Sequence, residues 1–220
     1  MNVLRQPCPW VYSEVVARYL RTVDEVLDIG TGSGERLSNL AGLFGRGLGI
    51  DVDPEMVEQA QRSSAAPNVK FGVGSARLEG MTATFDLILN RHAPLELRAI
   101  AGHLKPGGYF ITQQVGERNM AAVKAALGQP EGNPVIGKEE IARSGLRLLA
   151  FGEYDVEYVV SDIESLVFWL GALDVLHTGT DGSTALASAA TLNKILTGNT
   201  DHRGFVTNEH RYLTVAQQPG

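Results

Sequence analysis

The sequence contains a single cysteine, Cys8, and no long hydrophobic run. One cysteine excludes an internal disulfide, and no Cys/His cluster has the spacing of a zinc site, so we expect no metal. The longest uncharged apolar run, Leu166–Leu173, is far shorter than the ~20 residues that span a bilayer. The first ten residues lack the apolar core of a signal peptide. We therefore expect a soluble, cytoplasmic protein with no membrane partner.

Basic residues are also fewer than acidic ones: 19 Lys and Arg stand against 25 Asp and Glu, a formal net charge of −6. Nucleic-acid-binding proteins usually carry a basic patch or stripe, so no nucleic-acid partner is expected. The hydrophobic fraction of 44% is typical of a globular protein and excludes wholesale disorder. The length predicts one domain over residues 1–220. Nothing in the sequence indicates an oligomeric state.

Short apolar runs alternate with helical patterns from about residue 11 to residue 115. The predicted buried strands are 25–29, 47–50, 68–73, 85–89 and 109–112, and helices are expected between them. A helix containing Leu97, Ile100 and Leu104 is expected to end in a turn over 105–108. Such alternation is typical of βαβ units, with a parallel sheet covered by helices on both faces. The fold class is therefore α/β.

The strongest local signal is a glycine loop that follows the first of these strands. Residues 26–34 read VLDIGTGSG, so a buried strand leads into Gly30, Gly32 and Gly34 and then into a helix. Glycines at such a turn let a ligand lie against the backbone. Asp51 ends the next strand, 51 − 30 = 21 residues after the first glycine, where an acid can accept both ribose hydroxyls of an adenosine. The pattern predicts a cofactor that contains adenosine.

The spacing of the loop and its charge indicate which cofactor binds. A dinucleotide fingerprint, GxGxxG, would have its last glycine where this chain has Glu35. Asp28, two residues before the first glycine, would repel a pyrophosphate but attract an ammonium group. S-adenosylmethionine has an α-ammonium, a sulfonium and no phosphate. The charges therefore favour S-adenosylmethionine over NAD.

Four segments together resemble the class I S-adenosylmethionine-dependent methyltransferases, particularly the small-molecule branch that includes ubiquinone- and menaquinone-type enzymes. They read VLDIGTGSGE (26–35), GIDVDPEMVEQA (49–60), FDLILNRHAP (85–94) and LKPGGYFITQ (104–113), in the order and spacing of that family. The resemblance covers residues 24–115, the expected cofactor-binding core. It implies a doubly wound, seven-stranded sheet of order 3-2-1-4-5-7-6 with the last strand antiparallel.

The resemblance also implies roles for particular residues. The glycine loop would hold the methionine part of the cofactor, Asp51 the ribose, and Val52 would lie beside the adenine. Where the family often has an acid for the adenine amino group, this chain has Gly74-Ser75-Ala76, so the Ser75 hydroxyl or the backbone would serve. The implied cofactor-binding residues are Asp28, Gly30, Thr31, Gly32, Gly34, Asp51, Val52, Ser75, Ala76 and Asn90.

His92 is the candidate catalytic residue, because it follows the fourth strand, whose tip lies next to the transferred methyl in this fold. Histidine titrates near neutrality, so His92 is suited to removing a proton from a hydroxyl or amine nucleophile. The alternative is a loop histidine that only positions a ligand. Arg91 would pair with a carboxylate of the cofactor or substrate, or with Asp28.

The late part of the chain predicts two strands, 153–160 and 205–215, that would complete the sheet. Between them, residues 161–204 contain two helix candidates, one beginning after Asp162 and one over 183–196. An insertion of that size is expected to be a helical cap over the substrate pocket. Phe168 and Trp169 within it, with Trp10 and Tyr12, are candidates for an aromatic pocket or for core positions.

The predicted function is methyl transfer from S-adenosylmethionine to a small molecule, on oxygen, nitrogen or carbon, by in-line displacement. Two alternatives remain. A short NAD-dependent oxidoreductase would need the missing glycine and a Tyr-x-x-x-Lys pair, which this chain lacks. The other alternative is a catalytically inactive protein that binds the cofactor and acts as a partner of another protein.

Overall fold

The computed structural model describes residues 3–130, 132, 135–172 and 182–220. The chain forms two compact units, each made of three separate segments. The core unit comprises residues 9–115, 135–153 and 212–220, and the second unit comprises residues 1–8, 116–134 and 154–211. The glycine loop, Asp51 and His92 all belong to the core unit.

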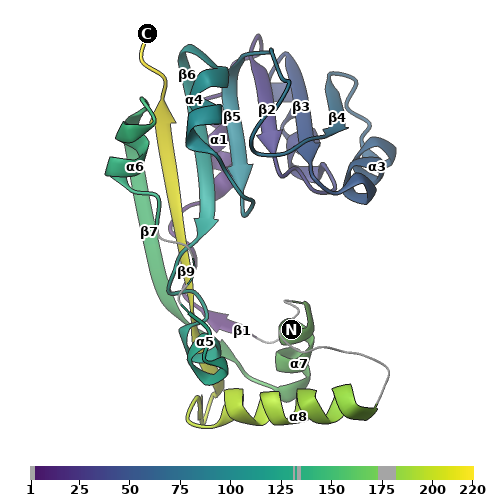
Figure 1. The fold of residues 1–220 in the computed structure, drawn as a ribbon, viewed down its shortest axis with the longest axis vertical. Coiled ribbons are helices and arrows are strands. Elements are labelled where there is room, and N and C mark those ends of the chain that lie inside the picture. The colour runs from purple at the N-terminus through teal and green to yellow at the C-terminus, as the bar shows by residue number, and fades with distance from the viewer. Residues whose placement is uncertain (1–2, 131, 133–134, 173–181) are drawn as a thin grey trace. The chain divides into compact units, whose positions relative to one another are not determined.

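A mixed sheet organises the fold and has strands in both units (Figure 1). The strands are β1 (Val3–Arg5), β2 (Glu25–Ile29), β3 (Arg46–Asp51), β4 (Val69–Val73), β5 (Phe85–Arg91), β6 (Leu104–Val115), β7 (Arg147–Val160), β8 (Thr200–Asp201) and β9 (Gly204–Gln217). Their order is β4-β3-β2-β5-β6-β9-β7-β1, and β8 pairs with β9. Pairs β4–β3, β3–β2, β2–β5 and β5–β6 are parallel.

This order confirms the α/β class and the predicted seven-strand sequence, read as 3-2-1-4-5-7-6 from β4 to β7. In Figure 1 the arrow of β9 points opposite to those of β5 and β6, as the prediction requires. The prediction of seven strands was too low, because two short strands, β1 and β8, extend the sheet. β1 pairs antiparallel with β7 in the second unit. Runs of three and two residues are too short to show an alternating pattern.

Two hydrophobic cores cover the two faces of the core sheet. Successive residues of β2 divide between them, so that Val26 packs in one core and Leu27 in the other. The helices that contribute are α1 (Tyr12–Ala17), α2 (Glu35–Asn39) and α3 (Pro54–Ser63) in the first core, and α4 (Leu97–His103) and α6 (Lys138–Arg143) in the second. A short 3-10 turn, Ala41–Leu43, follows α2. This is the doubly wound arrangement that the alternating pattern predicts.

Two boundaries differ from the sequence prediction. Leu104 was expected in a helix that ends in a turn, but it is the first residue of β6 and pairs with Phe85. A register irregularity between Phe85 and Leu87 lets the strand accommodate the glycines at 107 and 108. β7 begins at Arg147, six residues before the predicted start at Glu153. The earlier start was not predicted because residues 147–152 read RLLAFG, which does not alternate in polarity.

The second unit packs its helices around a smaller core. The helices are α5 (Ala121–Leu127), α7 (Ile163–Ala172) and α8 (Gly182–Leu196). The Asp162 carboxylate accepts from the Ser165 N–H at 2.7 Å, so the predicted start of α7 is confirmed. The core residues are Val123, Tyr158, Val160, Leu166, Leu170, Ile195 and Phe205. The described helices of the segment 161–204 therefore pack with 121–127 as part of a unit, and the role of the segment as a cap stays a prediction. The loop 178–181 and the Trp169 side chain lie outside the described residues.

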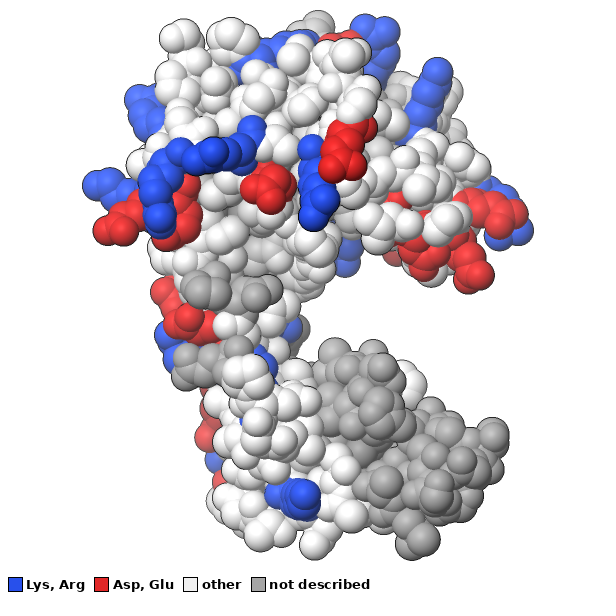
Figure 2. All heavy atoms as spheres, viewed as in Figure 1, with Lys and Arg blue, Asp and Glu red and all other residues white. Residues whose placement is uncertain are grey.

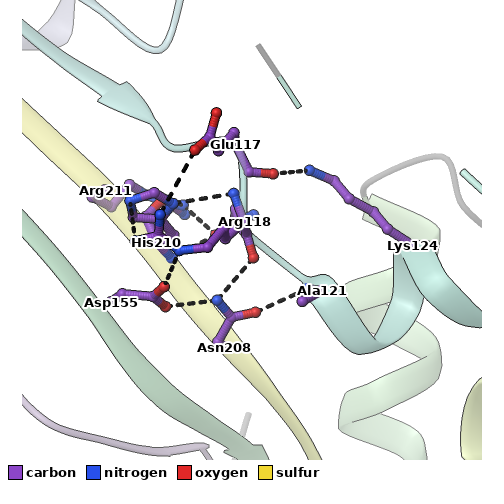
Figure 3. Close-up of polar contacts among 9 residues, drawn as sticks. Glu117, Arg118, Ala121, Lys124, Asp155, Asn208, His210 and Arg211 are labelled. Atoms are coloured by element: carbon purple, nitrogen blue, oxygen red, sulfur yellow. Dashed lines mark hydrogen bonds and ion pairs between the residues drawn. The ribbon is translucent and has the colours of Figure 1, made fainter. Parts of the chain in front are cut away.

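A polar network also lies within the second unit, between β9, β7 and the loop after β6 (Figure 3). The backbone N–H of Arg118 donates to Nδ1 of the buried His210 at 3.1 Å. The Arg118 side chain donates to Asp155 at 3.0 Å, and the Asn208 amide bonds both Asp155 and the Arg118 carbonyl. These contacts join segments that lie 37 to 92 residues apart in the chain.

The surface and the helix lengths bear on possible partners. The face in Figure 2 carries both basic and acidic side chains, and several acidic ones lie together over α3. Within the described part of the chain, no helix is long and apolar enough to cross a bilayer. Among the same residues, no group of three or more His, Cys, Asp or Glu is arranged to hold a metal ion.

Candidate functional site

The glycine loop turns sharply at the carboxyl end of β2. Gly30, Gly32 and Gly34 all have positive φ angles, of 74°, 55° and 73°, which other L-residues adopt only under strain. The N–H groups of Gly30 and Thr31 donate to the Ile50 carbonyl at 2.9 and 3.0 Å. The start of the loop is therefore attached to β3.

The three glycines of the loop differ in the space available around them. A Cβ atom at Gly30 would lie 2.2 Å from the Ala93 Cβ, and one at Gly34 would lie 2.6 Å from the Phe71 ring. A Cβ at Gly32 would meet nothing within 4 Å. Gly30 and Gly34 are thus required by packing, whereas the backbone at Gly32 borders open space that a ligand can fill.

Asp28 places a buried carboxylate beneath the loop. Only 9% of the residue is exposed, and the Thr31 hydroxyl donates to it at 2.8 Å. Burial raises the pKa of Asp28 to about 6; the Thr31 hydrogen bond and the charge of Arg36 lower this pKa, and Asp51 raises it. The raised pKa means that the surroundings only partly compensate the carboxylate charge. A cationic group placed beside Asp28 would compensate the rest of the carboxylate charge.

Asp51 lies at the tip of β3 and braces the loop. One of its oxygens accepts from the Gly32 N–H at 2.8 Å and the other from the Asp53 N–H at 3.0 Å. A carboxylate oxygen has two lone pairs, so each oxygen can accept one hydroxyl besides. The Asp53 carboxylate in turn accepts from the Glu55 N–H at 2.9 Å and caps α3, as its sequence predicts. The next residue after Asp51, Val52, is 68% exposed, unusual for a large apolar side chain unless something covers it.

Two clefts of the core unit are lined in part by residues that adjoin this loop, Arg36 after it and Ile50, whose carbonyl it bonds. The first, about 520 Å³, is lined by residues of α1, α2 and the end of β5, including Tyr12, Arg36 and Arg91. The second, about 380 Å³, is lined by Ile50, Val73, Gly74, Ser75, Leu78, Glu79, Gly80 and Met81. Predicted ribose and adenine contacts, Asp51 and Ser75, therefore lie at or next to the second cleft. Ala76 packs against the second core of the sheet.

The side chain of Asn90, a predicted cofactor contact, has hydrogen-bond partners within the protein. Its side chain is fully buried, and its amide donates to the carbonyls of Ile29 and Pro94, both at 3.1 Å. Its oxygen accepts from Thr112 at 3.2 Å and from Gln114. The side chain thus fixes the end of β5, and a cofactor contact at this position would use the backbone.

His92 follows β5 in a left-handed conformation, with φ of 55°. This region is uncommon for residues other than glycine and is enriched at functional sites. Its backbone N–H donates to the Gln113 carbonyl at 2.9 Å. Its ring Nε2 lies 3.0 Å from the Gln113 side-chain nitrogen.

Tyr12, Arg91 and Arg36 also lie at the site, although the sequence signal for each of them is weak. The Tyr12 hydroxyl donates to the carbonyls of Ile111 and Asn90 at 3.2 and 3.4 Å. Burial, and then the charge of Asp28, raises the pKa of Tyr12. The Arg91 guanidinium lies 5.9 Å from the centre of the Tyr12 ring, within cation–π range. Arg36 lines the same cleft and was missed, because an arginine on the first turn of a helix looks like an ordinary surface residue.

Part of the core unit matches a known protein family. Residues 26–108 match the methyltransferase domain family. The ribosomal protein L11 methyltransferase of Thermus thermophilus is 32% identical over 145 residues, 63% of this chain and 56% of that protein. The trans-aconitate 2-methyltransferase of Deinococcus radiodurans is 30% identical over 102 residues, 42% of this chain and 38% of that protein. The chain spans about half or less of the length of these curated relatives.

Solved structures share the fold across nearly the whole chain. A putative methyltransferase from Bacillus halodurans has a TM-score of 0.70 at 14% identity, and covers 94% of this chain and 97% of its own. A methyltransferase from Thiobacillus denitrificans, in complex with S-adenosyl-L-homocysteine, has a TM-score of 0.59 at 19% identity, covering 93% and 90%.

Part of the core unit thus matches the methyltransferase domain family, as the sequence predicts, and the chain shares its fold with a solved putative methyltransferase. Within this chain the methyltransferase domain is recognised over residues 26–108, which contain the glycine loop, Asp51 and His92.

Proposed function

We propose that this protein transfers the methyl group of S-adenosylmethionine to a small-molecule acceptor. The observation that carries the proposal is the partly compensated carboxylate of Asp28 beside the glycine loop, with two clefts lined by residues that adjoin the loop. An α-ammonium would compensate Asp28, the ribose would bond Asp51, and the adenine would occupy the cleft beside Ser75. A dinucleotide would place its pyrophosphate near Asp28, which charge disfavours.

When bound, the cofactor supplies an electrophilic methyl on a sulfonium that leaves as a neutral thioether. The residues of this chain bind and orient. The backbone at Gly32 and the Asp28 carboxylate would fix the methionine part, and the end of β5 would set the direction of attack. Holding the nucleophile in line can contribute ~7–11 kcal/mol through proximity. His92 would contact the acceptor there.

The first cleft supports an acceptor of small size. Its volume of about 520 Å³ falls in the range of small-molecule pockets, ~300–1,000 Å³. Arg36 and Arg91 make one side of it cationic, which suits a carboxylate of the cofactor or of the acceptor. The trans-aconitate methyltransferase among the relatives, whose name gives a small acid as substrate, is consistent with this choice.

A protein acceptor is the second candidate. The relatives named for ribosomal protein L11 share 31–34% identity with this chain over 113 to 145 residues. The shared part covers 37–56% of those proteins. The remaining parts of those proteins, which this comparison does not include, can also contact the acceptor.

The deciding experiment has two stages. Calorimetry should show binding of S-adenosylmethionine and no binding of NAD; binding of NAD alone would contradict the proposal. Transfer of a labelled methyl group is then measured on phenols, amines and hydroxy acids, with ribosomal protein L11 in parallel. Transfer to L11 only would establish the second candidate, and tight cofactor binding without transfer to any acceptor would indicate an inactive partner protein.

Asp51→Ala tests the ribose contact within the same assay. Loss of charge-assisted hydrogen bonds worth ~1.5–3 kcal/mol each should lower cofactor affinity by at least ~tenfold. The same substitution frees the Gly32 and Asp53 N–H groups, so the melting temperature of the free protein should fall as well. Asp53→Ala removes the neighbouring cap without touching the loop and serves as the control. An unchanged dissociation constant in Asp51→Ala would exclude Asp51 from the ribose site.

A further inference from the structure

His92, Gln113 and Trp10 form a continuous hydrogen-bonded chain within the core unit. The Trp10 indole N–H donates to the side-chain oxygen of Gln113 at 2.8 Å, across 103 positions of sequence. The side-chain nitrogen of Gln113 lies 3.0 Å from Nε2 of His92. Gln113 is 7% exposed, so its amide exchanges these partners for water only at a cost.

The chemistry of tryptophan sets the direction of these hydrogen bonds. An indole N–H can only donate, so the Gln113 oxygen must face Trp10 and its NH₂ group must face His92. An NH₂ group there needs a lone pair on Nε2. Nε2 of His92 therefore accepts, and in the neutral ring the proton resides on Nδ1.

Both ends of the chain are held by the fold. Trp10 packs against the first core of the sheet, and a Cβ atom at Gly152 would lie 3.2 Å from its ring. Gln113 pairs with Arg91 in the β5–β6 register. Its carbonyl accepts from the His92 backbone N–H, so one residue fixes both the backbone and the ring of His92.

We propose that Gln113, oriented by Trp10, is a positioning residue that holds His92 as its Nδ1–H tautomer. The consequence for methyl transfer rests on the proposed function. The lone pair of the ring is already engaged by Gln113, so in this tautomer His92 is an N–H donor and does not take the proton of the acceptor. Such a donor suits an oxygen-bearing acceptor that needs orientation, for example a carboxylate, which is already a nucleophile without losing a proton.

The tautomer can be measured directly on the full chain. Nitrogen-15 NMR of ring-labelled histidine distinguishes a protonated ring nitrogen from an unprotonated one, and His92→Asn identifies the His92 signals among those of the five histidines. We expect a protonated Nδ1 and an unprotonated Nε2 in the wild-type protein. A wild-type spectrum with the proton on Nε2 would overturn the proposal.

Two variants test the cause. Gln113→Glu keeps an acceptor for Trp10 but turns the group facing His92 from a donor into an acceptor, so the proton should move to Nε2. Trp10→Phe removes the indole N–H, which should release the amide and give both tautomers. Gln59→Glu is the control, because it makes the same substitution at an exposed position on α3. It should leave the spectrum as in the wild type.

The outcomes separate this inference from the proposed function. A spectrum of Gln113→Glu identical to the wild type would refute the role of Gln113. If Gln113→Glu does not fold, the wild-type and Trp10→Phe spectra decide. Absence of S-adenosylmethionine binding in calorimetry would refute the proposed function and leave the tautomer result unaffected.

Discussion

The two units contain buried polar groups of opposite character. In the second unit, Nδ1 of His210 accepts from the Arg118 backbone N–H, and Asn208 joins Asp155 to the loop (Figure 3). The backbone N–H of His210 donates to the Asn119 side chain. In the core unit, burial holds the pKa of Asp28 at about 6, well above its ordinary value. The first arrangement compensates its polar groups from within; the second leaves a charge partly compensated.

This difference separates a structural network from a ligand site. Buried polar groups that bond one another rigidify a fold and need no further partner. A buried carboxylate with incomplete compensation is costly to the free protein and becomes favourable only when a cation arrives. The contrast predicts which substitutions change cofactor affinity and which change stability alone.

Exchanging one closely packed glycine for alanine in each unit should give the largest effects. Gly30→Ala combines a positive φ with a contact of 2.2 Å and should cost about 2–4 kcal/mol of unfolding free energy. Cofactor binding should fall below detection in calorimetry. Gly116→Ala would place a Cβ 2.2 Å from the His210 ring and should lower the melting temperature while leaving the cofactor dissociation constant unchanged.

Gly32→Ala is the matched control, because its Cβ would meet no atom within 4 Å. Its stability loss should be limited to the strain of a positive φ, about 1–2 kcal/mol. If Gly116→Ala weakens cofactor binding as much as Gly30→Ala does, the two units are not separable in function.

Asp28→Asn should move stability and affinity in opposite directions. The folded-state pKa of Asp28 is raised, so the folded protein binds the proton more tightly and this group costs stability as pH rises through about 6. At pH 8, Asn should raise the unfolding free energy by about 1–3 kcal/mol. Cofactor affinity should drop ~10–100-fold through loss of the charge-assisted contact.

Thermal melts of both proteins at pH 4 and pH 8, with calorimetry at pH 8, check this. The gain in melting temperature should disappear at pH 4, where the wild-type carboxyl is already largely protonated. A variant that is less stable than the wild type at pH 8 would show that Asp28 is compensated within the free protein.

Asn119→Ala should affect only stability. It removes the acceptor of the His210 and Arg211 N–H groups and leaves a buried donor unsatisfied, at about 1–3 kcal/mol. Urea unfolding measures the loss, and the cofactor dissociation constant should match that of the wild type. Weaker cofactor binding at a temperature where the variant is fully folded would contradict the separation of the two regions.

Ser75→Ala should give the smallest change. The Ser75 hydroxyl accepts from the Arg77 N–H at 3.3 Å, a weak bond. If the hydroxyl also contacts the adenine, cofactor affinity should fall by roughly 2–10-fold, corresponding to one neutral hydrogen bond of about 0.5–1.5 kcal/mol. No change would assign the adenine contact to the backbone of the loop after β4.

Local patterns were enough to predict the sheet and the glycine loop. The strand order followed from the alternation of strands and helices together with the family resemblance, and Asp53 was predicted to cap α3 from the adjacent proline. Asp51 lies next to the loop because parallel neighbouring strands end at the same edge, and its bond to Gly32 follows from that placement.

Contacts between distant segments were not predictable in the same way. The pairing of Trp10 with Gln113 depends on the side chains that meet after folding, and neither residue lies in a motif that indicates it. Asn90 shows the converse: its position in the chain matches a ligand contact, yet its amide bonds are used within the protein. The left-handed backbone of His92 and the bond of its N–H to the Gln113 carbonyl likewise have no signal in the sequence.

The position of β9 in the sheet has a consequence for synthesis on the ribosome. Leu213 and Val215 complete one core of the core unit, and Ala216 contributes to the other. Strands β2 to β6 emerge from the ribosome long before these residues, and until then the edge of β6 is unpaired. An unpaired edge with two open apolar faces favours aggregation. The nascent chain therefore remains vulnerable until β9 is released, and chains interrupted before residue 204 should be substrates for chaperones or proteases.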